Sequence, residues 1–160
     1  AGTASSGNGN TSAQQEVLAA MKGNFGTTLA APSITSARFI TSALAAGSSK
    51  TVTVEVTWDE RVTIAGSPQI TLANGNQGSG SGRTCVLTYT GTGSTTNRKR
   101  FTATNITVAE DDVTTLGGGS QADIALNSGT LSDTTVGGTT TAALRVLTAL
   151  AAQTQTTTAA

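Results

Sequence analysis

The residues with the clearest potential for chemistry are three adjacent acidic ones, Glu110, Asp111 and Asp112, with Asp123 and Asp133 further along the chain. Neighbouring carboxylates in one loop could bind Ca²⁺, which takes roughly six to eight oxygen ligands. The spaced D-x-D-x-D-G pattern of a calcium loop is absent, however. We therefore favour a solvated turn after a strand and predict no metal site, with these three residues as the candidate ligands if a site exists.

Two other charged runs could act as sites. Arg98-Lys99-Arg100 could contact an acidic partner or a glycan. Charge also protects an edge strand from pairing with other chains, and we favour that interpretation. Asp59-Glu60-Arg61 contains two adjacent carboxylates, but successive strand residues point to opposite faces. This run is therefore predicted to be a turn rather than a catalytic acid pair.

The chain has no histidine and a single cysteine, Cys85. The absence of histidine removes His-based triads, histidine general bases and most zinc sites. Cys85 lies in a strand-like segment and is predicted to be a small buried hydrophobe. The glycine-rich runs at 78–82 and 117–119 lack the Lys-Ser/Thr pair of a phosphate-binding loop. We predict neither an enzyme nor a cofactor.

The composition describes a small neutral protein. Its 160 residues suit one domain, and nine basic and nine acidic residues cancel at a charged fraction of 11%. A nucleic-acid binder would show a basic excess, and a membrane span would need roughly 18 consecutive apolar residues. Neither is present in the sequence. We expect no signal peptide, and the small residue Ala1 suits either removal of an initiator Met or cleavage of a precursor.

The elements that position these groups are organised around residues 50–72. Apolar and polar residues alternate there in three short runs, the pattern of half-buried strands. Three such strands cannot bury their apolar faces alone and need a second sheet. The predicted core consists of Val52, Val54, Val56, Trp58, Val62, Ile64, Ile70 and Leu72.

Several further strands follow from the same pattern. They are predicted at 34–44, 83–90, 98–108, 122–126 and 143–147. The strand spacing, the Gly-rich turns and the lack of a helical period predict an all-β protein, an antiparallel β-sandwich of about seven or eight strands. The sandwich is assigned to residues 33–148, and the Thr-, Gln- and Ala-rich residues 149–160 are predicted to be a C-terminal tail.

Residues 1–32 form a predicted N-terminal arm with one short helix. Ser12 and Gln15 match a capping box, and Gly23 suits the end of a helix. A helix of about three turns is unstable alone, so its apolar side needs a partner. The predicted partner-docking residues are Val17, Leu18, Met21, Phe25 and Leu29.

Three blocks together resemble a known type of repeat. They are VTVEVTWDERVTIAGSPQITLANG, LTYTGTGSTTNRKRFTATNITVAEDD and IALNSGTLSD. The pattern is similar to the Ig-like repeat of large bacterial surface and adhesin proteins, with Ser128 in place of a glycine. The resemblance covers about residues 34–147 and implies an Ig-like sandwich. Members of that family usually occur in tandem arrays, whereas this chain has one copy between two terminal segments.

These features predict a structural virion protein, a bacteriophage capsid decoration or cement protein at the capsid surface. Its partners would be the major capsid protein or other virion proteins, with homo-oligomeric contacts in a large assembly. Nucleic acid and membrane are not expected partners, whereas weak glycan binding stays open. The alternative is an adhesin or fibre module on the bacterial cell surface that binds glycans or neighbouring copies. A threonine-rich surface suits either.

Overall fold

A computed structural model of the chain describes residues 31–76, 83–134 and 140–160. The chain divides into two units, Ala1–Ala30 and Ala31–Ala160. We call the second unit the β-domain. The predicted helix of the N-terminal arm and its five docking residues lie outside the described residues.

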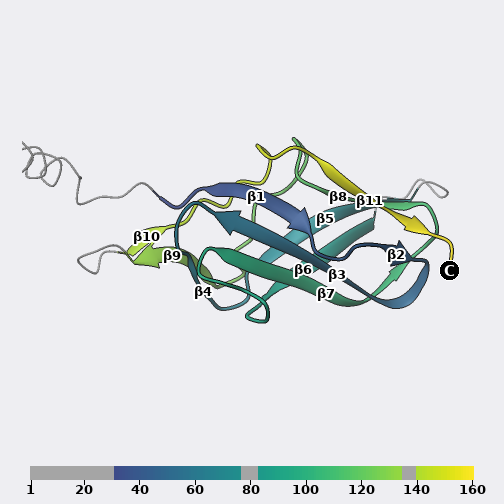
Figure 1. Cartoon of the computed structure of the whole chain (residues 1–160), viewed down its shortest axis with the longest axis horizontal. Helices are drawn as coiled ribbons and strands as arrows, with labels where there is room; N and C mark the ends of the chain where they lie inside the picture. The colour runs from purple at the N-terminus through teal and green to yellow at the C-terminus, as the bar shows by residue number, and fades with distance from the viewer. Residues whose placement is uncertain (1–30, 77–82, 135–139) are drawn as a thin grey trace, which may run out of the picture. The chain divides into compact units, whose positions relative to one another are not determined.

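The β-domain is built from eleven strands, with no helix among the described residues (Figure 1). They are β1 (Ile34–Phe39), β2 (Leu44–Ala45), β3 (Gly47–Trp58), β4 (Thr63–Ala65), β5 (Gln69–Asn76), β6 (Arg83–Thr90), β7 (Arg98–Val108), β8 (Asp112–Leu116), β9 (Thr130–Thr134), β10 (Thr140–Ala142) and β11 (Gln153–Thr158). The prediction of an all-β protein is confirmed for this part of the chain. No helix long and apolar enough to cross a membrane occurs in the described ranges.

The strands form two sheets. Eight of them pair in the order β1-β3-β7-β6-β5-β8-β11-β2, and three pair as β10-β9-β4. All neighbours are antiparallel except β11 and β2, which are parallel. Antiparallel pairing suits short strands joined by turns, which is the pattern in the sequence.

The large sheet curls so that its two edges approach each other. β1 and β2 are consecutive in the chain, yet they lie at opposite edges of the sheet. Two side chains of β11 reach across to the β1 side: Gln153 Nε2 donates to the Ala37 carbonyl at 2.6 Å, and Gln155 Nε2 donates to the Thr41 carbonyl at 2.7 Å. These bonds satisfy carbonyl groups that an open edge would expose.

The core lies against the inner face of β3 and β7. Val54 pairs with Phe101 across the two strands, and both side chains are fully buried. Trp58 is also fully buried, and its Nε1 donates to the Leu144 carbonyl at 3.0 Å. Of the eight predicted core residues, Ile64 is partly buried against this cluster, and the other seven are buried.

The C-terminal residues are not a tail. Residues 153–158 form β11, which pairs with β8 on one side and β2 on the other. Gln155 and Thr157 alternate inward and are buried. The strand escaped prediction because its inward residues are polar, so no apolar alternation marks it.

Three other predicted strands differ in the structure. The segment 34–44 is split between β1 and β2. The segment 122–126 contributes a single bridge, between Ala125 and Gln69. The segment 143–147 is irregular, although Ala143 and Leu147 are buried. In the last two segments some apolar side chains, such as Ile124 and Leu147, are buried, but neither segment forms a strand.

The position of β11 predicts that the C-terminal residues are needed for stability. Removing residues 153–160 should lower the free energy of unfolding by about 3 kcal/mol or more, since several hydrogen bonds of about 1 kcal/mol each are lost. Urea denaturation measures the change. Removal of Ala159 and Ala160 alone, which are exposed beyond β11, is the control and should be neutral. Equal stability of the two truncated chains would contradict the assignment of β11 to the sheet.

Candidate functional site

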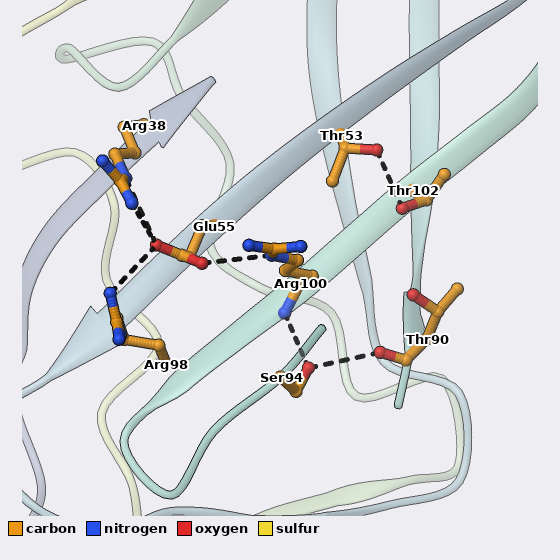
Figure 2. A network of polar contacts seen from close by, with 8 residues as sticks. All are labelled: Arg38, Thr53, Glu55, Thr90, Ser94, Arg98, Arg100 and Thr102. Carbon is orange, nitrogen blue, oxygen red and sulfur yellow. Dashed lines mark hydrogen bonds and ion pairs between the residues drawn. The ribbon is translucent and has the colours of Figure 1, made fainter. Parts of the chain in front are cut away.

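Three arginines surround a buried carboxylate, Glu55, on the β-domain (Figure 2). Glu55 lies between Val54 and Val56 on β3, so strand alternation turns it away from the core. Only 3% of its side chain is exposed. The cover is provided by three arginines from the two neighbouring strands.

Strand register places the arginines around the carboxylate. Glu55 pairs with Arg38 of β1 on one side and with Arg100 of β7 on the other. Arg38 donates to Glu55 Oε1 from Nη2 at 2.8 Å and from Nε at 3.2 Å. Arg100 Nε donates to Oε2 at 3.1 Å, and Arg98 Nη1 lies 4.0 Å from Oε1. One carboxylate therefore links three adjacent strands.

The arginines keep this buried carboxylate ionised. Burial by itself would raise the pKa of Glu55, but the hydrogen bonds and positive charges of Arg38 and Arg100 outweigh it. The pKa consequently lies below the ordinary value of 4.5. A carboxylate held in this way is a poor general base because its lone pairs already accept from guanidinium groups. Its role is to hold strands and charges in place.

The cluster has an excess of positive charge. Three guanidinium groups against one carboxylate leave two positive charges, and the side chains of Arg38, Arg98 and Arg100 are 59%, 48% and 34% exposed. We call these three arginines the arginine face. Thr53 and Thr102 form the next cross-strand row, with their hydroxyl oxygens 3.1 Å apart. Guanidinium and hydroxyl groups on a rigid sheet are suited to bind anionic, hydroxyl-rich partners.

The prediction that Arg98-Lys99-Arg100 protects an edge strand is wrong. These residues begin β7, which lies between β3 and β6 inside the sheet. Arg98 and Arg100 point to the outer face and neutralise Glu55, whereas Lys99 is buried on the other side of the strand. Arg98 and Arg100 therefore belong to an ion cluster on the outer face of a strand that lies inside the sheet.

Arg100 also positions the loop that follows β6. Its backbone N–H donates to Ser94 Oγ at 3.0 Å, and Ser94 Oγ donates to the Thr90 carbonyl at 3.3 Å. Gly93 has a φ of +71°, and any side chain there would collide with the Arg100 guanidinium. The glycine allows the loop 91–97 to lie directly over the arginine.

The acidic residues predicted from the sequence do not converge. Asp112 is fully buried, and its Oδ2 accepts a hydrogen bond from the Ala109 backbone N–H at 2.8 Å. Glu110 and Asp111 are exposed on the turn between β7 and β8. Across the described ranges, no group of three or more His, Cys, Asp or Glu side chains is arranged to hold a metal ion.

The remaining candidate residues have structural surroundings. Asp59 Oδ1 accepts a hydrogen bond from the Ser33 backbone N–H at 2.7 Å, which ties the start of the β-domain to the turn after β3. Cys85 is buried, and burial raises the pKa of its thiol to about 11. The thiolate that a nucleophile requires is therefore scarce at neutral pH.

The sequence reasoning missed Glu55. Its signal was present: Glu55 alternates with the core valines, and Arg98 and Arg100 are two residues apart and share one strand face. The pairing of β3 with β7, which brings them together, is not visible in the sequence. The chain matches no protein-family model, no curated protein and no solved structure, so the site is interpreted from its geometry.

The ion cluster predicts a defined dependence of stability on pH. The folded-state pKa of Glu55 is lowered, so its stabilising contribution is complete above about pH 4.5 and is lost as the pH falls through the folded-state value. Glu55→Gln should lower stability at neutral pH and remove part of the stability loss that the parent protein shows as the pH falls below about 4.5. Denaturant titrations across this range measure both effects.

Glu110→Gln is the matched control, because it removes an exposed carboxylate elsewhere on the domain. It should follow the parent protein closely. If Glu55→Gln and the parent lost stability in parallel as the pH falls, the lowered pKa of Glu55 would be refuted.

Proposed function

We propose that this chain is a structural virion protein, a bacteriophage capsid decoration or cement protein. The observation that carries the proposal is the division of the chain at Ala30 and Ala31. The β-domain builds its hydrophobic core from residues between Ile34 and Leu150. The apolar residues of the arm, such as Val17 and Met21, then bind the major capsid protein or another virion protein.

The displayed part is an Ig-like antiparallel β-sandwich in this proposal. Three observations support it: a curled eight-stranded sheet, a separate three-stranded sheet, and a hydrophobic core made of inward-facing residues. The segments 52–75, 87–112 and 124–133 that resemble bacterial surface repeats contribute strands of both sheets. Such domains act as spacers and binding modules on many surfaces, so the fold alone does not choose among functions.

A non-catalytic role agrees with how the reactive groups are used. Glu55 is held by arginines, Asp112 accepts a backbone hydrogen bond, and burial keeps the Cys85 thiol protonated. Each of these groups contributes to the fold through the contacts that suppress its reactivity. The arginine face, by contrast, exposes guanidinium groups beside threonine hydroxyl groups, which suits binding.

The second candidate is an adhesin or fibre module on the bacterial cell surface. The arginine face favours it, because exposed guanidinium groups can bind acidic glycans or carboxylates of neighbouring copies. A precursor with a signal peptide and tandem copies of the domain would support this candidate. A gene placed among capsid genes would support the virion protein.

If the arm docks on a virion protein, its apolar residues should determine how tightly the chain binds the particle. Val17→Asp with Met21→Asp should weaken binding to particles of the encoding virus by at least about a hundredfold, since each buried apolar side chain is worth roughly 1.5–3 kcal/mol. Co-sedimentation of the full chain with purified particles measures binding. Thermal unfolding of the β-domain should not change.

Glu16→Gln is the control within the arm, because it alters a polar residue directly before Val17 and leaves the apolar residues unchanged. It should bind like the parent chain. The proposal fails if the parent chain does not bind particles, or if the double variant binds them as tightly as the parent.

A further inference from the structure

A second positively charged region lies on the other side of β7 from the arginine face. It is an open depression of about 420 Å³. Its walls come from the segment 61–64, from Tyr89 at the end of β6, from the loop residues 94–96 and from Lys99. Small-molecule sites typically measure roughly 300–1,000 Å³, so the depression has the size of a site for a single sugar-sized ligand.

Two cations line the depression without a carboxylate among the described lining residues. Lys99 is only 8% exposed, and its Nζ donates one hydrogen bond, to the Thr95 carbonyl at 2.7 Å. Burial, and then the positive charge of Arg61, lower the pKa of Lys99. A buried ammonium group beside a second cation is costly unless an anion approaches it. The depression therefore favours a negatively charged ligand.

The rest of the lining suits a ring with hydroxyl groups. Tyr89 and Ile64 are partly buried against the core and form an apolar floor. The Tyr89 ring is held edge-to-face against Phe101, with centroids 5.9 Å apart and an interplanar angle of 60°. At the rim, Thr95 and Thr96 are exposed and carry hydroxyl groups that can bond to a sugar.

We propose that this depression binds an acidic sugar, a hexuronate-type ring with one carboxylate. The carboxylate lies against Lys99 and Arg61, and the ring lies on Tyr89. A bare anion would leave the apolar floor and most of the volume empty, and a neutral sugar would leave the two cations without a counter-charge. The proposal goes beyond the virion role and does not depend on it, because the residues that line the depression all belong to the β-domain.

The test is a titration of the full-length chain with glucuronate, followed by amide chemical shifts in nuclear magnetic resonance spectra. Saturable shifts are expected at Thr63, Thr95 and Thr96. Arg61→Gln changes an exposed side chain and should weaken binding by about tenfold, as loss of one charge-assisted hydrogen bond does. Arg98→Gln removes a cation from the arginine face and should leave the affinity unchanged.

Titrations with glucose and with inorganic sulfate test recognition of the ring and recognition of the anion separately. Weaker binding of both than of glucuronate would support a site for an acidic ring. Binding of sulfate as tight as that of glucuronate would show an anion site without ring recognition and would overturn the proposal. Absence of shifts with glucuronate, or a loss of binding in Arg98→Gln but not in Arg61→Gln, would also overturn it.

Discussion

One short connection constrains the whole β-domain. Only four residues, 40–43, separate β1 from β2, yet these strands lie at opposite edges of an eight-stranded sheet. A flat sheet of eight strands spaced ~4.8 Å apart would place its edges ~34 Å from each other. The path from Phe39 to Leu44 spans at most ~18 Å when fully extended. The sheet must therefore curl until its edges approach, and this curl encloses the core.

The curl explains how polar side chains of β11 reach the β1 side of the sheet. Gln153 and Gln155 bond to carbonyl groups of Ala37 and Thr41 because the curl brings β11 next to the β1 side. On the outer face, Glu55 links β1, β3 and β7 through its arginines. The hydrogen bond from the Arg100 backbone N–H to Ser94 Oγ also holds the loop 91–97 against β7. The same loop lines the depression for which we propose an acidic sugar, so the ion cluster helps to hold one wall of that depression in place.

The sequence predicted those strands in which apolar and polar residues alternate within the strand itself. The residues of β3, β6 and β7 were predicted because apolar residues such as Val54, Leu87 and Phe101 alternate with polar ones. β11 was missed because its inward residues, Gln155 and Thr157, are polar, and their burial depends on partners more than 100 residues away in the chain. The charges of 98–100 were assigned to an edge because Glu55, the counter-ion of Arg98 and Arg100, lies on a strand whose pairing is set by the sheet order. The depression around Lys99 was not visible in the sequence, since its walls come from four separate parts of the chain.

Gln153 and Ala37 make the contact that depends most directly on the curl of the sheet. Nuclear Overhauser spectra of the full-length chain would record it. We expect cross-peaks between the side-chain amide protons of Gln153 and the Hα proton of Ala37, together with those that join β2 to β11. Absence of both sets, while the cross-peaks between β3 and β7 persist, would show that the sheet does not curl.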